Sequence, residues 1–151
     1  MTPVEEVLYN RARSIAAEAH RGQVDKAGKD YFEHPMRVDA RLTDPKAKVV
    51  ALLHDTIEDT DVTSEYLYEQ GFSKEIVDAV LSVTRKEGET YMDFIHRASE
   101  NPLGKIVKIA DLEDNMDITR LPELKDSDFS LLKRYHKAYK YLTNTEHEET
   151  V

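Results

Sequence analysis

The chain has 151 residues, a mass of 17.4 kDa and 40% hydrophobic residues, which is enough for one hydrophobic core and too little for two ordinary domains. It contains no cysteine, so disulfides, thiolate nucleophiles and zinc–thiolate sites are excluded. The formal net charge of -9 argues against nucleic-acid partners, because binding to a phosphate backbone requires a concentrated basic surface. A small anionic substrate remains compatible, since a bound metal ion can reverse the potential inside a pocket.

The N-terminal segment has none of the features of a signal peptide. It carries Glu5, Glu6 and Arg11 and lacks a long apolar run. No stretch of the chain approaches the roughly 20 apolar residues of a membrane span. We therefore expect a cytoplasmic protein without a membrane partner.

Apolar residues recur with helical spacing almost throughout the chain, and we find no strand-like alternation and no internal repeat. The sequence therefore predicts an all-α fold, a single compact bundle of about eight helices. Capping residues and prolines give the expected starts, namely Thr2-Pro3, Pro35, Asp44-Pro45, Thr63, Ser73, Thr90 and Asn101-Pro102. The third helix is expected to continue past Ile57 and the seventh to about Thr119, and a last helix covers 129–142.

One domain is expected over residues 1–143, followed by a polar tail over 144–151. In the first helix, Val4 and Val7 are expected on the apolar face together with Leu8 and Ile15. The polar segment that follows this helix contains Gly28 and is interpreted as a loop. This loop brings His34 to the start of the second helix.

Two helices that look buried carry ionisable residues inside apolar stretches. His54 and Asp55 follow Ala51-Leu52-Leu53, and Asp111 follows Ile109-Ala110. Burying such groups is costly unless they are paired or bind a metal. Neutral imidazole with carboxylates is a suitable set for a divalent ion, and His34 could complete the site.

Further polar residues recur one helical turn from these candidates. Glu58 follows His54 by one turn, Asp59 follows Asp55, and Asn115 follows Asp111. The two carboxylates could move protons on an activated water, and the amide could orient a ligand. Taken singly, a buried histidine is more often a hydrogen-bonded core residue, and a helical aspartate is usually solvated or paired. The combination favours a site.

At this point the sequence resembles the HD-domain phosphohydrolases, specifically the small alarmone hydrolases related to the hydrolase half of RelA/SpoT proteins. The resemblance spans about residues 8–141 and is carried by three blocks. These are Ala19-His20-Arg21-Gly22-Gln23 with Tyr31-Phe32-Glu33-His34-Pro35, Ala51-Leu52-Leu53-His54-Asp55-Thr56-Ile57-Glu58-Asp59-Thr60, and Val107-Lys108-Ile109-Ala110-Asp111-Leu112-Glu113-Asp114-Asn115.

The resemblance implies an HD-domain bundle with one divalent ion, usually Mn²⁺, held by His34, His54, Asp55 and Asp111. It implies that Glu58 and Asp59 position and activate the attacking water, and that Asn115 lies in the substrate pocket. The expected reaction is removal of the 3′-pyrophosphate from a small-molecule nucleotide, guanosine tetraphosphate or pentaphosphate. Lys26 and Tyr31 are the further expected substrate contacts, and Lys29, Lys108 and Arg120 are additional candidates for phosphate contacts.

Two departures leave alternatives open. Asp25 stands where many alarmone hydrolases have the first residue of a basic pair, and the segment from Met116 to Arg120 resembles a bacterial subgroup with a less securely assigned substrate. One alternative is therefore an HD hydrolase of another nucleotide or of a dinucleotide phosphate. Another is a catalytically silent nucleotide-binding regulator, although binding alone does not require the pair Glu58 and Asp59. The sequence does not determine the oligomeric state.

Overall fold

The computed structural model describes residues 1–144, and this part of the chain is helical. Its elements are α1 (Pro3–Ala19), α2 (Glu33–Ala40), α3 (Pro45–Leu53), α4 (Thr56–Asp59), α5 (Ser64–Glu69), α6 (Lys74–Ser82), α7 (Tyr91–Ser99), α8 (Pro102–Asn115), the 3₁₀-helix η1 (Ile118–Arg120) and α9 (Asp126–Thr143). Over the same residues the only β pairing is a single antiparallel bridge between Val24 and Asp30. The predicted all-α fold is confirmed. Of the predicted tail, 145–151 lie outside the described residues.

Local hydrogen bonds start most helices at the residues that the sequence indicates. In each case a side-chain oxygen of the capping residue accepts a hydrogen bond from a backbone N–H in the first turn. The caps are Thr2, Asp44, Thr63, Ser73, Thr90 and Asn101. Replacing such a cap by alanine typically costs about 1 kcal/mol of stability. These starts were predictable because each depends on residues within one turn.

The prediction of one continuous helix past Ile57 is wrong, because the chain breaks between α3 and α4. The Nδ1–H of His54 donates to the carbonyl of Ala51 at 2.5 Å, and Thr56 Oγ1 donates to the carbonyl of Leu53 at 2.8 Å. Both side chains thus compete with the backbone for helical acceptors. The break gives nine α-helices in the described residues where about eight were expected.

Two smaller predictions also differ from the structure. The helix expected to reach Thr119 ends at Asn115, because Asp117 accepts hydrogen bonds from the backbone and hydroxyl of Thr119 and thereby starts η1. Val4 and Val7 are 68% and 54% exposed. The first helix buries its later residues instead, where it packs against α3.

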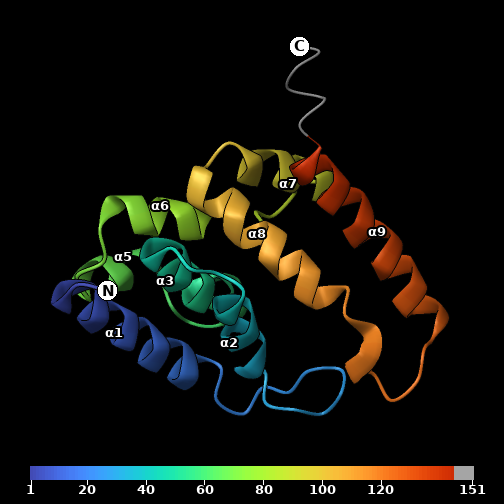
Figure 1. The fold of residues 1–151 in the computed structure, drawn as a ribbon, viewed down its shortest axis with the longest axis horizontal. Coiled ribbons are helices and arrows are strands. Elements are labelled where there is room, and N and C mark those ends of the chain that lie inside the picture. The colour runs from blue at the N-terminus through green and yellow to red at the C-terminus, as the bar shows by residue number, and fades with distance from the viewer. Residues whose placement is uncertain (145–151) are drawn as a thin grey trace.

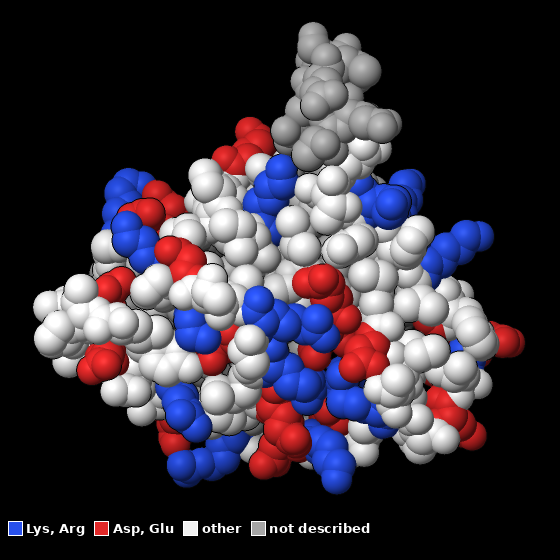
Figure 2. Space-filling model, in the orientation of Figure 1, with Lys and Arg blue, Asp and Glu red and all other residues white. Residues whose placement is uncertain are grey.

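Helix α8 runs through the middle of the molecule (Figure 1), with α1 to α6 on one side and α7 and α9 on the other. Two groups of buried apolar residues follow this division. The larger includes Leu52, Leu53, Val77 and Val107, and the smaller includes Leu112 and residues of α7 and α9. Among the described helices, none is long and apolar enough to cross a membrane. On the face shown in Figure 2, Lys and Arg side chains are interspersed with Asp and Glu.

Candidate metal centre and adjoining cavity

Four candidate ligands come from three parts of the chain. His34 is in the first turn of α2, and Asp111 lies in α8. His54 and Asp55 form the turn between α3 and α4. His34, His54 and Asp111 are buried, and Asp55 is partly buried. Helices α2 and α3 therefore bring His34, His54 and Asp55 next to Asp111 of α8.

The Nε2 atoms of the two histidines face the same two carboxylate oxygens. His34 Nε2 lies 2.9 Å from Asp111 Oδ1 and 3.7 Å from Asp55 Oδ2. His54 Nε2 lies 3.1 Å from Asp55 Oδ2 and 3.4 Å from Asp111 Oδ1. Candidate ligand atoms of His34, His54 and Asp111 all lie within 4.8 Å of one another. Two imidazole nitrogens and carboxylate oxygens at this spacing could hold one divalent transition-metal ion.

The remaining ring nitrogen of each histidine is already engaged. His54 Nδ1 donates to the carbonyl of Ala51, and His34 Nδ1 donates to Asp114 Oδ2 at 2.6 Å. A neutral imidazole carries one N–H, so in the neutral form of both rings these bonds would leave the Nε2 lone pairs directed at the shared position. Among the described residues, His54 Nε2 is a buried atom without a hydrogen-bond partner. The donor set therefore fits a metal ion on chemical grounds.

The charges around the two imidazoles favour a cation between them. Burial alone would lower the pKa of His54, but Asp55 and Asp111 outweigh burial and raise that pKa well above its usual value. Burial alone would also lower the pKa of His34, but Asp111 opposes this effect, and the pKa of His34 is raised. Because a metal ion and a proton compete for these nitrogens, metal affinity is expected to fall at low pH.

Two further side chains, Lys108 and Tyr31, contact the carboxylates of the candidate ligands Asp111 and Asp55. Burial would raise the pKa of Asp111, but Lys108, whose Nζ lies 2.8 Å from Asp111 Oδ2, and His54 hold it well below its usual value. Lys108 is itself buried, with its ammonium 4.9 Å from the centre of the Phe94 ring. This candidate for a phosphate contact is thus paired with a carboxylate of the candidate metal centre.

Tyr31 belongs to the same arrangement. Its hydroxyl donates to Asp55 Oδ2 at 2.5 Å, and its ring also lines a cavity. Burial of the phenol and the nearby Asp55 carboxylate raise the pKa of Tyr31, so the hydroxyl stays protonated and able to donate. The residue predicted as a substrate contact therefore touches a candidate metal ligand as well.

The two predicted catalytic carboxylates lie on the short helix α4. Glu58 Oε1 accepts a hydrogen bond from the backbone N–H of Arg85 at 2.6 Å. The carbonyl of Asp59 accepts a hydrogen bond from Gln23 Nε2 at 3.2 Å. Partial burial and the negative charges of Asp55 and Glu58 raise the pKa of Asp59 to about 6. A carboxyl group with this pKa can accept and release a proton near neutral pH.

A cavity of about 330 Å³ opens beside His34. Lys26, Tyr31 and Asn115, the three predicted substrate contacts, all line it. Asn115 Nδ2 also donates to Asp111 Oδ1 at 3.1 Å, which joins the cavity to the candidate metal centre. Helix α9 supplies an apolar wall of Leu131, Leu132 and Tyr135. The combination of apolar wall and polar rim is typical of a small-molecule site.

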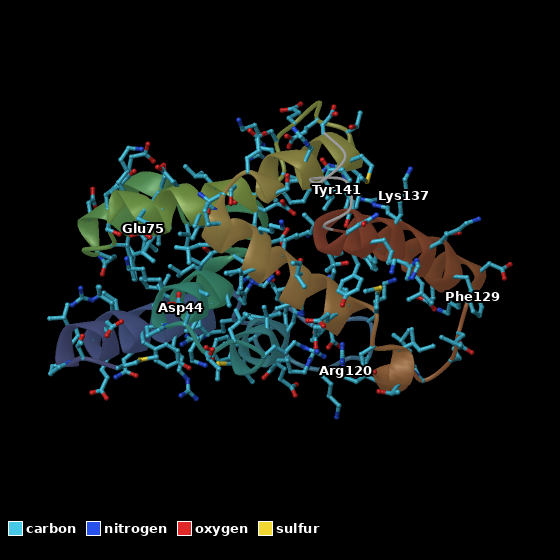
Figure 3. The ribbon with its side chains drawn as sticks, turned by 45° about the horizontal axis from the view of Figure 1, so that its top comes forward. Asp44, Glu75, Arg120, Phe129, Lys137 and Tyr141 are labelled. Carbon is cyan, nitrogen blue, oxygen red and sulfur yellow. The ribbon has the colours of Figure 1, made fainter. Side chains whose placement is uncertain are left out.

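The basic residues of this cavity are largely paired with acids. Lys26 Nζ lies 3.2 Å from Asp128 Oδ1. Arg120, on η1 beside the end of α8 (Figure 3), lies 3.3 Å from Asp117 Oδ2. Asp25 also lines the cavity, and its carboxylate accepts hydrogen bonds from two backbone N–H groups of its own loop. The cavity walls therefore carry no simple excess of positive charge.

Two other sequence candidates lie at the edge of the site. His20 is buried, its Nδ1 lies 3.0 Å from Gln23 Oε1, and its ring packs 4.9 Å from that of Tyr31. This contact with Gln23 lets His20 support the loop that follows α1. Lys29 is exposed, and its backbone N–H donates to Asp25.

Sequence reasoning missed Asp114 and Arg37. Asp114 is fully buried and accepts hydrogen bonds from His34 and from the guanidinium of Arg37, which lines the cavity. The available signal was its position three residues after Asp111 on the same apolar helix. Arg37 follows His34 by one turn on α2, but no local pattern connected Asp114 to either residue, because 77 or more positions separate it from both.

The comparison with known proteins gives several related sequences, although no family model matches the chain. It is 34% identical over 118 residues to a guanosine-3′,5′-bis(diphosphate) 3′-pyrophosphohydrolase of Aquifex aeolicus, covering 70% of this chain. It is 35% identical over 134 residues to a probable GTP pyrophosphokinase of Mycobacterium leprae and 36% identical over 128 residues to a GTP pyrophosphokinase rsh of Brucella melitensis, covering 80% and 75% of this chain. The chain spans only 17% of the length of these relatives.

A solved structure has the same fold. It is described as a metazoan ortholog of SpoT that hydrolyzes ppGpp, and it matches with a TM-score of 0.73 and 24% sequence identity. The match covers 89% of this chain and 84% of that protein. The expected resemblance is thereby confirmed: the chain is a homologue of one segment of the RelA/SpoT-type proteins and has the helical fold of the SpoT ortholog.

Proposed function

We propose that this chain is a metal-dependent phosphohydrolase that releases pyrophosphate from the 3′ position of guanosine 3′,5′-bis(diphosphate). His34, His54, Asp55 and Asp111 would hold one divalent ion, with Mn²⁺ as the expected metal. The observation that carries the proposal is the convergence of two imidazole Nε2 atoms on two carboxylate oxygens beside a cavity of about 330 Å³. The activity of the Aquifex aeolicus relative supports the choice of reaction.

A bound divalent ion supplies Lewis acidity, which lowers the pKa of water and neutralises charge on phosphoryl oxygens. The protein supplies the remaining parts. Asp59, with a pKa raised to about 6, would take the proton from the attacking water and return it to the leaving group. Glu58 would orient that water from its position against the backbone of Arg85.

Substrate binding falls to the residues of the cavity. Asn115 would hydrogen-bond the nucleotide while its amide holds Asp111. Lys26 would exchange its partner Asp128 for a phosphate oxygen. Tyr31 would border the base opposite the apolar wall from α9. These contacts would position the 3′-diphosphate at the metal centre.

Incubation of Mn²⁺-loaded protein with guanosine 3′,5′-bis(diphosphate) tests the activity. GDP and pyrophosphate should appear in equal amounts, and Asp111→Ala protein should produce neither. Absence of pyrophosphate at micromolar enzyme, with the metal shown to be bound, would reject this substrate assignment.

One observation favours a second candidate, the hydrolysis of another nucleotide or of a dinucleotide phosphate. Asp25 and Asp128 place carboxylates in the cavity wall, and Asp128 already pairs with Lys26. A more highly phosphorylated substrate would meet more repulsion there than a less charged one. Faster phosphate release from another member of a nucleotide panel would select this candidate.

A further inference from the structure

The carboxylate of Asp114 lies in the interior, next to the candidate metal centre. Its residue is 0% exposed and is in the last turn of α8. Asp114 Oδ2 lies 2.6 Å from His34 Nδ1. Asp114 Oδ1 accepts from Arg37 Nε at 2.9 Å, and its Oδ2 accepts from Arg37 Nη2 at 3.2 Å. Arg120 Nη2 lies 3.5 Å from the same Oδ2. Every one of these partners is a donor.

A buried carboxylate needs charged donors, and the two arginines satisfy this requirement without His34. The bond to His34 has a separate consequence. An imidazole that donates from Nδ1 in its neutral form carries a lone pair on Nε2, the atom that faces Asp111 and Asp55. The partner of Nδ1 therefore decides which ring nitrogen can bind a metal.

The second histidine of the site is oriented in a different way. His54 Nδ1 donates to the backbone carbonyl of Ala51, which no substitution removes. For His34 the corresponding acceptor is a side chain. This difference makes the orientation of His34 accessible to mutation while that of His54 stays constant.

We propose that Asp114 is a positioning residue that fixes His34 in the tautomer and orientation that present Nε2 to a divalent ion. Through the same carboxylate, Asp114 anchors Arg37 and Arg120, both of which line the cavity. The inference rests on the metal site of the proposed function and does not depend on which nucleotide is hydrolysed.

Asp114→Asn is the informative variant because it keeps the shape of the side chain. An amide has one acceptor oxygen and one donor nitrogen. If its oxygen faces Arg37 Nε, its nitrogen donates to His34 Nδ1 and moves the ring proton to Nε2. If its oxygen faces His34, its nitrogen opposes the guanidinium of Arg37. Either arrangement disturbs one of the two partners.

Titration calorimetry with Mn²⁺ alone should show that Asp114→Asn weakens metal binding by about 10- to 100-fold. Asp39→Asn is the matched control. Asp39 is also a buried carboxylate, paired with Tyr9 and Lys48 on the far side of α2, and it contacts none of the four candidate ligands. Its substitution should lower the melting temperature and leave the metal Kd within about twofold of wild type.

Nitrogen-15 NMR of the zinc-loaded protein gives a direct readout, because Zn²⁺ is diamagnetic and also binds imidazole. In wild-type protein, His34 should carry its proton on Nδ1 and its metal on Nε2. A signal from metal-bound Nδ1 would overturn the proposal, even if Asp114→Asn fails to fold.

The possible outcomes distinguish a failure of the proposed metal site from a failure of the positioning role of Asp114. If wild-type protein binds no divalent ion, the metal site itself is wrong and the role of Asp114 is wrong with it. If wild-type protein binds the ion and folded Asp114→Asn binds it equally well, only the positioning role is rejected. A weaker Kd for Asp114→Asn, with Asp39→Asn unchanged, supports the role.

Discussion

At the scale of single residues, two carboxylates four positions apart acquire opposite properties. Burial would raise the pKa of Asp55, but His54 lowers it to about 2. Partial burial and the charges of Asp55 and Glu58 raise the pKa of Asp59 to about 6. One carboxylate is therefore suited to hold a cation and the other to exchange a proton, a separation typical of acid–base sites.

The raised pKa of Asp59 predicts a pH-dependent effect of Asp59→Asn on the stability of chelator-treated protein. The pKa rises from 3.8 to about 6 on folding, so the folded state takes up the proton first. The stability that the proton on Asp59 contributes to the folded state is lost as the pH increases through about 6. Asparagine resembles the protonated form, so the variant should be more stable than wild type near pH 7.5 and similar to it near pH 4.

Urea unfolding at several pH values measures this difference. Asp61→Asn removes another exposed carboxylate close by and controls for the change in net charge. A stability difference between Asp59→Asn and wild type that stays constant with pH would contradict the prediction.

A second prediction at this scale separates metal binding from catalysis. Asp111→Ala should abolish binding of Mn²⁺ because it removes a carboxylate oxygen that faces both histidines. Glu58→Ala should keep the metal and reduce the rate by about 10²- to 10⁴-fold, the range expected for loss of an acid–base or water-orienting group. Metal analysis and steady-state kinetics of both variants are the measurements. Equal activity of the two variants would overturn the site assignment.

At the scale of helices, the candidate metal centre depends on how closely α8 approaches its neighbours. A Cβ atom added at Gly104 would lie 2.0 Å from Ser82 Oγ and 3.2 Å from Ser82 Cβ, so α6 and α8 touch at this glycine. Asp111 lies two turns further along α8. The glycine thus permits the approach of the helix that carries a candidate ligand.

Gly104→Ala should therefore destabilise the protein by about 1–3 kcal/mol, although alanine is the better helix former. Ser82→Ala in the same chain should restore most of this loss, because it removes the oxygen that the new methyl group meets. Chemical denaturation of the two single variants and the double variant gives the coupling energy. Additive effects would show that the contact is not the cause.

At the scale of the whole molecule, the candidate ligand Asp111 lies on α8 between the two groups of buried apolar residues. His34 and His54 belong to helices packed in the larger group, and Asp111 precedes Leu112, a member of the smaller group. An ion bound by all of them would therefore cross-link α8, which packs in both groups, to the helices of the larger group. We expect residues 1–143 to unfold as one unit.

Thermal unfolding with and without Mn²⁺ tests this expectation. The ion should raise the melting temperature of wild-type protein, with about 2.7 kcal/mol of stabilisation at a concentration 100 times the Kd. EDTA should reverse the shift, and Asp111→Ala should show none. Leu112→Ala should lower the melting temperature of a single transition, at a cost of about 2–5 kcal/mol. Two separate transitions would contradict a single cooperative domain.

The sequence by itself determined the features that depend on neighbours along the chain. Helical periodicity gave the all-α fold, and caps such as Thr2 and Ser73 start their helices through hydrogen bonds within one turn. Motif spacing also singled out His34, His54 and Asp111, whose candidate ligand atoms lie within 4.8 Å of one another. Their roles in metal binding stay predictions.

Only the tertiary structure decided which side chains orient these groups. The ring of His34 is held by Asp114, which lies on a helix 80 positions away in sequence. Likewise, Lys26 and Asn115 line one cavity because α8, α9 and the loop after α1 meet there. Hydrogen bonds and ion pairs of this kind depend on distance in space, which periodicity along the chain does not encode.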